Sequence, residues 1–131
     1  MIQTNAHMNM DVSAFQKLDV VFSGHYHTRS NDGKIFYLGN PYQMYWNDCN
    51  DKRGFHIFDT ETYQLEYIDN PYTIFEKVYY EDTNAKLFDA RYLKDKIVKI
   101  IVRKKSNQYE FERYVDKIDK SGCLDTVSYT H

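Results

Sequence analysis

The most informative stretch of the chain reads Asp19-Val-Val-Phe-Ser-Gly-His-Tyr-His-Thr-Arg29. A short apolar run that stops at Ser-Gly predicts a buried strand over Val20–Phe22. Hydrolysis of a phosphodiester by a binuclear centre uses two cations about 3.5 to 4 Å apart, held by histidine and carboxylate ligands. Two imidazoles that leave one strand end can each present a nitrogen to one of two neighbouring ions. We therefore predict that His25 and His27 bind metal, and that Gly24 allows the sharp turn before them. The alternative is an incidental histidine pair.

Turn signals divide the next fifty residues into two pairs of strands. Ser30-Asn-Asp-Gly33 is a strong turn, and the strand predicted at Lys34–Leu38 should form a hairpin-like return with the first strand. A second hairpin is predicted from Gly54–Phe58 and Tyr63–Ile68, joined by the polar turn Asp59-Thr-Glu-Thr62. At the start of the chain, Val12–Leu18 is predicted to form one or two turns of helix.

The C-terminal third predicts a strand, a helix and another strand within residues 97–129. Apolar residues occupy the even positions of Ile97–Arg103, so the face carrying Val98, Ile100 and Val102 should be buried. Asn107 is the predicted N-cap of an amphipathic helix, with Glu110 completing a capping box. Four apolar residues of this helix share one face, Phe111, Tyr114, Val115 and Ile118. We place the domain boundary between residues 80 and 81.

The net charge of the 131-residue chain is −2, which gives no overall electrostatic sign of nucleic-acid binding. The charge is uneven, however, because residues 81–131 hold eleven basic and nine acidic residues. Lys99, Arg103, Lys104 and Lys105 are candidates for contacts with DNA phosphates, and the alternative is a solvated face. The two cysteines have no CxxC spacing, and no apolar run is long enough to span a bilayer. We therefore expect a cytoplasmic protein without a membrane association.

The segment Phe22-Ser-Gly-His-Tyr-His27 resembles the last metal motif of calcineurin-like metallophosphoesterases. The downstream segments Gly39-Asn-Pro41 and Lys52-Arg-Gly-Phe-His-Ile-Phe58 are similar to those that follow this motif in SbcD-type DNA repair nuclease subunits. The amino-acid sequence of residues 48–62 looks especially like the corresponding segment of these nuclease subunits in T-even-like phages. The resemblance extends from about residue 8 to about residue 120.

The resemblance implies an α+β fold. Residues 1–80 would be the C-terminal part of a phosphoesterase β-sandwich, and residues 81–131 the start of a small α/β cap domain that helps to position DNA. The parent protein would be a homodimeric DNA exonuclease or endonuclease with two divalent ions, manganese by resemblance, one bound by His25 and the other by His27. Its partner would be an SbcC-like ATPase, and it would act in the bacterial host cytoplasm if phage-encoded.

The other metal motifs of this family, and its general-acid histidine, precede the motif found here and do not occur in residues 1–18. We therefore expect a gene fragment that carries no catalytic residue of its own and is inactive alone. Residues 127–131 resemble the translation of sequencing-adapter read-through, which together with the absent motifs suggests a gene fragment. A general metallophosphatase or phosphodiesterase is the first alternative function, and a non-catalytic binding module is the second.

Several other side chains could belong to the site. Tyr26, Asn40 and Tyr42 lie close in sequence to the histidine pair or its neighbouring strand and could line the cleft. The aromatic residues of 42–46 could stack on a base or form a small satellite core, and the satellite core is favoured. Asp48 and Asp51 are interpreted as members of a solvated loop. His56 is expected to pack or to face solvent, and His7 to lie on the surface.

Overall fold

The computed structural model describes residues 15–130, which form two compact units. The N-terminal unit comprises the described residues up to Tyr42 together with Lys52–Asn70. The C-terminal unit comprises Gln43–Asp51 together with the described residues from Pro71 onward. Within residues 15–130, no helix has the length and apolar character needed to cross a bilayer.

The first sheet of the N-terminal unit has the order β1-β3-β2, from β1 (Val21–Ser23), β3 (Ile35–Tyr37) and β2 (Ser30–Asn31). The predicted hairpin between β1 and β3 is wrong, because these two strands are parallel. Residues 24–29 cross the sheet from the end of β1 to the start of β2, since Ser23 and Ser30 both lie opposite Tyr37, and β2 then runs back so that β3 can be parallel to β1. The true antiparallel partner of β3 is the short β2, across a turn in which the Asp32 carboxylate accepts hydrogen bonds from the backbone N–H groups of Lys34 and Ile35.

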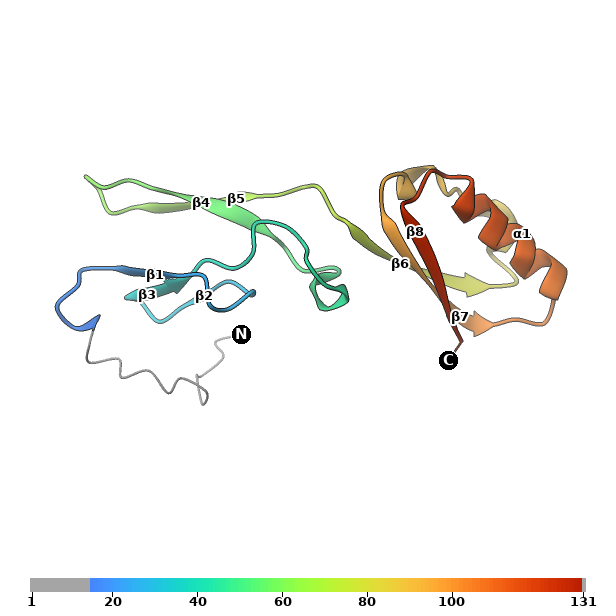
Figure 1. Cartoon of the computed structure of the whole chain (residues 1–131), viewed down its shortest axis with the longest axis horizontal. Coiled ribbons are helices and arrows are strands. Elements are labelled where there is room, and N and C mark those ends of the chain that lie inside the picture. The colour runs from blue at the N-terminus through green and yellow to red at the C-terminus, as the bar shows by residue number, and fades with distance from the viewer. Residues whose placement is uncertain (1–14, 131) are drawn as a thin grey trace. The chain divides into compact units, whose positions relative to one another are not determined.

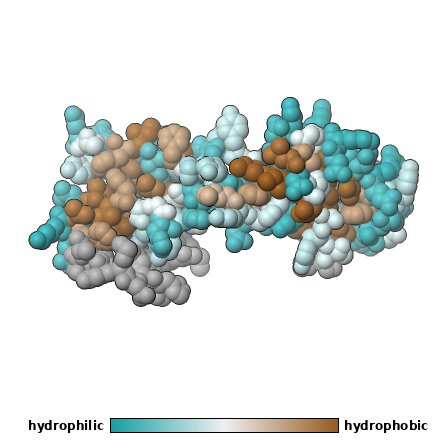
Figure 2. Space-filling model, viewed as in Figure 1, coloured by the Kyte–Doolittle hydropathy of each residue, from teal (hydrophilic) through white to brown (hydrophobic). Residues whose placement is uncertain are grey.

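The second hairpin is confirmed. Strands β4 (Gly54–Phe58) and β5 (Leu65–Asp69) are antiparallel, and the Asp59 carboxylate closes their turn by accepting from the backbone N–H groups of Glu61 and Thr62. Phe58 on β4 packs edge-on against Phe22 on β1, with ring centroids 4.9 Å apart. The hairpin and the first sheet therefore share a small aromatic core. The other face of β4 leaves Phe55 and Ile57 about half exposed, and Figure 2 shows apolar surface of this kind on both units.

The C-terminal unit is built on the parallel sheet β6-β7-β8, from β6 (Phe75–Glu81), β7 (Ile97–Lys104) and β8 (Asp125–Thr130). Helix α1 (Gln108–Asp119) makes the crossover from β7 to β8 and covers one side of the sheet (Figure 1). Two short 3-10 helices, η3 (Ala85–Leu87) and η4 (Arg91–Leu93), connect β6 to β7. Parallel neighbours need such crossovers.

The predicted strand-helix packing is confirmed. Val98 and Ile100 are fully buried and Val102 nearly so, and they belong to the same core as Ile118 of α1, with Phe111 and Val115 packed against it. The Asn107 side chain accepts a hydrogen bond from the Glu110 N–H at 3.1 Å, as expected of the N-cap.

The division into units differs from the boundary expected between residues 80 and 81. Strand β6 pairs with β7 over its whole length, so it belongs to the C-terminal unit. The segment Gln43–Asp51, which contains the 3-10 helix η2 (Trp46–Asp48), belongs there too. The Gln43 side chain holds it, because its Oε1 accepts hydrogen bonds from the N–H groups of Ile74 at 2.8 Å and Phe75 at 2.9 Å.

At the start of the described chain, the N–H of Leu18 donates to the carbonyl of Phe15 and closes a single turn. The rest of the helix predicted at Val12–Leu18 lies outside the described residues, as do His7 and His131.

Candidate metal centre

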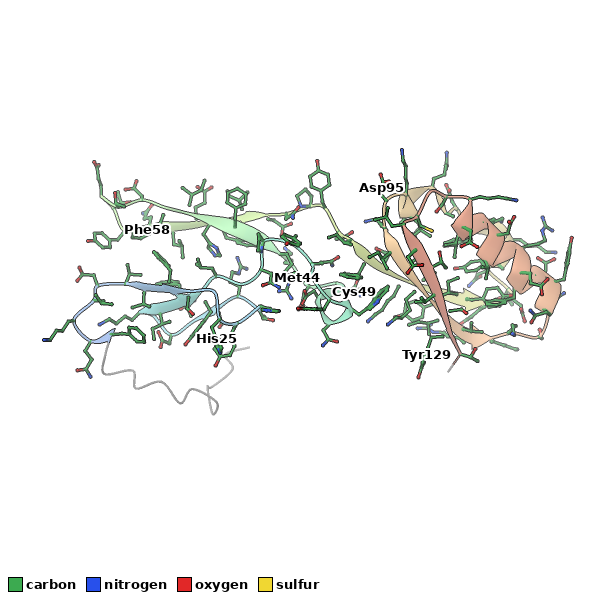
Figure 3. All side chains as sticks on the ribbon, in the orientation of Figure 1. His25, Met44, Cys49, Phe58, Asp95 and Tyr129 are labelled. Atoms are coloured by element: carbon green, nitrogen blue, oxygen red, sulfur yellow. The ribbon has the colours of Figure 1, made fainter. Side chains whose placement is uncertain are left out.

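The histidine pair lies on the loop that follows β1, and both His25 and His27 are exposed. The N–H of His25 donates to Ser23 Oγ at 3.2 Å. Its ring meets Tyr26 edge-on at 4.8 Å, and Tyr26 in turn meets the buried Tyr37 of β3 at 4.9 Å. Through these two ring contacts, Tyr26 links the imidazole of His25, which is labelled in Figure 3, to strand β3.

The backbone of His27 is held from outside the loop. Its carbonyl accepts hydrogen bonds from the Asn40 N–H at 3.0 Å and from Arg53 Nη1 at 2.9 Å. Arg53 is only 5% exposed, so its guanidinium holds the loop backbone from the buried side. A charged hydrogen bond of this kind is stronger than one between neutral groups. The sequence reasoning did not single out Arg53, whose position before the β4 glycine gives no sign of burial.

Gly39 makes the close approach between the loop and the end of β3 possible. Its φ is +74°, and a Cβ built there would lie 2.9 Å from the carbonyl oxygen of His27 and 3.1 Å from the Arg29 nitrogen. Gly24 was expected to be needed for a sharp turn before the histidines, but that expectation is wrong. A Cβ on Gly24 would meet nothing within 4 Å, and its φ is not positive. The steric need falls on Gly39 instead.

Asn40 and Tyr42 differ in their surroundings. Asn40 is 8% exposed, and its backbone N–H bonds directly to the histidine loop. Its side-chain Nδ2 is buried and makes no hydrogen bond with the described part of the chain, which is a costly state for an amide. Tyr42 is 49% exposed. Only Asn40, of these two predicted cleft residues, is shown in contact with the loop.

The donor set at this loop fits a metal site in part. Imidazole suits zinc and iron, whereas manganese is suited by carboxylate and carbonyl oxygens, which a manganese site here would need in addition to the histidines. Within residues 15–130, no three His, Cys, Asp or Glu side chains gather closely enough to hold an ion. Asp48 offers no ligand, and the expectation of a solvated loop is wrong for it. It is 4% exposed, and its Oδ2 accepts from the N–H groups of Met44 at 2.8 Å and Tyr45 at 3.2 Å.

The chain is similar to a curated protein, Exonuclease subunit 1 of Enterobacteria phage T4. The chain is 34% identical to it over 110 residues, which cover 77% of the chain and 32% of that protein. The chain therefore spans about a third of the length of this relative. No family model matches the chain. No solved structure matches it either. The expected resemblance to a phage nuclease subunit is confirmed at this level.

His56 packs as predicted. The centres of the His56 and Tyr67 rings lie 5.2 Å apart. The Arg29 guanidinium stacks on the Tyr67 ring, 3.6 Å from its centre. Burial, and then the charge of Arg29, lower the pKa of His56, so the neutral form is favoured. These three residues border a cavity of about 330 Å³ in the N-terminal unit.

The four predicted phosphate contacts separate in the structure. Lys99 and Arg103 alternate with the buried residues of β7 and so share the face opposite α1. Lys105 instead turns toward the helix, with its Nζ 4.9 Å from the Phe111 ring centre. Lys104 is exposed at the end of β7. The basic run is therefore not one patch.

Proposed function

We propose that the chain is part of a two-metal DNA nuclease and that it contributes His25 and His27 as ligands, one to each ion. The observation that carries this proposal is the construction of the histidine loop. Two exposed imidazoles follow the end of a strand, on a backbone tied to buried Arg53 and to Asn40. A surface loop with incidental histidines has no need of an internal guanidinium to fix it.

Each group of this loop has a definite part in the proposal. Two bound ions would supply Lewis-acid polarisation of the phosphate and a hydroxide at neutral pH. The Tyr26 ring restricts His25, while Arg53 and Asn40 fix the His27 carbonyl, so less freedom is lost when the imidazoles bind. Manganese is the proposed metal. The buried Nδ2 of Asn40 would be available to donate a hydrogen bond to a further group at this site.

The likeness to Exonuclease subunit 1 of phage T4 supports DNA as the substrate and a multi-subunit assembly. At the finer level, we propose an SbcD-type member of the calcineurin-like metallophosphoesterases, homodimeric and partnered by an SbcC-like ATPase in the host cytoplasm. The N-terminal unit would be the end of its β-sandwich, and the C-terminal unit the start of its cap. The further ligands and the general acid would belong to a longer protein, since residues 15–130 bring no third ligand near the pair. The chain alone would then be inactive.

The test uses the full-length protein to which the chain belongs. His25→Ala and His27→Ala should each weaken manganese binding in titration calorimetry. Each should also lower the rate of DNA cleavage by more than about 100-fold, because loss of a residue that only orients a metal ligand already lowers activity by up to about 100-fold. His56→Asn is the matched control, because this histidine packs on Tyr67 instead of lying on the loop. It should retain metal affinity.

Three results would count against the proposal in different ways. Full activity of a variant that combines His25→Ala with His27→Ala, at saturating manganese, would contradict the ligand assignment. Cleavage of a chromogenic phosphodiester with no cleavage of DNA would favour a general phosphodiesterase. A wild-type protein that binds no divalent ion would favour a non-catalytic binding module.

A further inference from the structure

The sheet of the C-terminal unit has one face under α1 and one face without a helix. Val78 and Tyr80 of β6 and the even positions of β7 fill the core beneath α1. Because side chains alternate along a strand, the other face carries Lys77 and Tyr79 of β6 and Lys99, Ile101 and Arg103 of β7. We call these five residues the open face. The register pairs Lys77 with Lys99 and Tyr79 with Ile101, and β8 continues the same side of the sheet with Asp125, Val127 and Tyr129.

One end of the open face is covered by the segment that contains η2. The Trp46 ring packs on Phe75 at 4.9 Å, and the ammonium of Lys99 lies 4.2 Å from the Trp46 ring centre. Beyond Trp46 the face is accessible, because Tyr79 is 47% exposed and the Arg103 side chain 56%. Aromatic rings and cations are therefore interleaved across a flat surface.

The open face carries three cations, Lys77, Lys99 and Arg103, on two neighbouring strands. On the same side of the sheet, β8 adds the carboxylate of Asp125, opposite Ile97. A single carboxylate, that of Glu81, approaches Arg103 at 3.8 Å, which is too long and too exposed to neutralise it. The Arg103 guanidinium lies over the Tyr79 ring, 4.1 Å from its centre, on a side chain that is 56% exposed. Nucleobases stack on aromatic rings and on guanidinium planes alike.

We propose that the open face binds single-stranded DNA, with bases stacked on the Tyr79–Arg103 pair and near Trp46, and with backbone phosphates paired to Lys77 and Lys99. This deepens the proposed nuclease function by naming the strand state that the C-terminal unit holds, and it rests on that function for the choice of DNA. Stacking platforms set among cations are the usual means of binding single strands without sequence preference.

The same features argue against two other occupants. A duplex hides its base faces and is read in its grooves by a projecting helix or ribbon, whereas the open face is flat. A partner protein would cover a surface whose centre is poor in charge, because lysine is depleted from the cores of protein interfaces. Here two lysines, Lys77 and Lys99, pair across neighbouring strands of the face.

Helix α1 supplies a matched control pair. Arg113 lies 5.9 Å from the Tyr109 ring centre, so the helix also presents an exposed tyrosine with an arginine over it. This pair is on the opposite side of the core, and its neighbours are of mixed charge, Glu110 and Glu112 together with Lys86 and Lys117. It has the residue types of the open face on a helix surface instead of a flat sheet.

The experiment uses the full 131-residue chain at low salt with EDTA present, so that neither metal binding nor cleavage contributes. An oligothymidine of about 15 nucleotides, within the range of common single-strand sites, is titrated into the protein. Trp46 is the only tryptophan, so its fluorescence reports directly on the open face. Anisotropy of a labelled oligonucleotide measures total binding in parallel. We expect saturable quenching of Trp46, affinity that falls steeply with salt, and weaker binding of a blunt duplex of equal length.

Substitutions then locate the site. Tyr79→Thr, which keeps strand propensity, and Arg103→Gln should each weaken binding roughly tenfold. Lys99→Gln should reduce the salt dependence by about one counterion. Tyr109→Ala and Arg113→Gln should leave the dissociation constant within about twofold, since both lie on the far side of the core. Circular dichroism establishes that each variant is folded, and the substitutions of exposed Arg103 and half-buried Lys99 still test the site if Tyr79→Thr does not fold.

Absence of single-strand binding by the wild-type chain would overturn the proposal. So would equal affinity for the duplex, binding that leaves Trp46 fluorescence unchanged, or equal losses in the α1 variants. The nuclease proposal is tested by metal binding and cleavage in the full-length protein, so either proposal can fail without the other.

Discussion

The close contact at Gly39 gives a sharp test of how the histidine loop is built. In Gly39→Ala the new methyl group would lie 2.9 Å from the His27 carbonyl oxygen, and the residue would have to keep a φ of +74°. Both the steric contact and the backbone conformation oppose the substitution.

The expected magnitude follows from these two effects. Holding a residue with a Cβ at such a φ costs about 1 to 2 kcal/mol. Relief of the contact displaces the carbonyl that accepts from Asn40 N–H and from the Arg53 guanidinium, and a hydrogen bond to a charged group contributes about 1.5 to 3 kcal/mol. Reduced freedom of the unfolded chain returns about 0.4 to 1 kcal/mol. We expect a net loss of about 2 to 4 kcal/mol.

Two other glycines separate the two effects. Gly33 has a φ of +93° but nothing within 4 Å of a built Cβ, so Gly33→Ala should cost about 1 kcal/mol from conformation alone. Gly24 has neither feature, and Gly24→Ala should be neutral or stabilising by up to about 1 kcal/mol. Urea denaturation followed by far-ultraviolet circular dichroism gives the order of stability. Hydrogen exchange at the Asn40 amide, which donates to His27, gives a local measure.

The reasoning requires Gly39→Ala to be the most destabilised of the three and to show the fastest Asn40 exchange. If Gly24→Ala lost as much stability as Gly39→Ala, the loop would depend on a turn at Gly24, and the assignment of the steric role to Gly39 would be refuted.

Two further predictions concern the C-terminal unit. Ile100→Ala should cost about 2 to 5 kcal/mol, because this side chain is fully buried beneath α1, whereas Ile101→Ala, on the open face, should cost clearly less; equal losses of Tm would show that the faces of β7 are misassigned. Hydrogen bonds from Ser106, and then from Tyr80, hold the pKa of Asp82 at about 2 against an ordinary 3.8. The unfolded chain therefore binds the proton first as pH falls, so the stability that Asp82 provides is present above about pH 4 and is lost toward pH 2. The unfolding midpoint, measured by Trp46 fluorescence, should therefore fall less steeply between about pH 4 and pH 2 in Asp82→Asn than in the wild-type chain. An unchanged slope would contradict the linkage.

The C-terminal unit was the more predictable part of the chain, because its signals are local. The alternation in residues 97–103 fixes which face of β7 is buried. Asn107 marks the start of α1 through a hydrogen bond that spans three residues. The place of β6 in the same sheet was missed, since its pairing with β7 joins residues more than twenty positions apart and leaves no local pattern.

The N-terminal unit shows the opposite case. A turn signal at Asn31–Gly33 predicts that the chain reverses, and it does, but the strand it pairs with β3 is β2 and not β1. Sequence spacing cannot distinguish these partners, because the choice depends on how residues 24–29 cross the sheet. The burial of Arg53 and Asp48 could not be predicted from the sequence either. Charged residues are rarely buried unless they are paired, and the partners here are backbone groups, which carry no signal in the sequence.

The candidate site follows the same rule. The residue types that could bind metal were evident from the order Gly-His-Tyr-His, since that chemistry is written in adjacent positions. Their placement depends on one backbone carbonyl, that of His27, on which Gly39, Asn40 and Arg53 converge from twelve to twenty-six residues away. None of the three touches a metal in the proposal, yet each determines where the imidazoles stand. Substitutions at these supporting positions should therefore alter metal affinity in the full-length protein while both histidines remain in place.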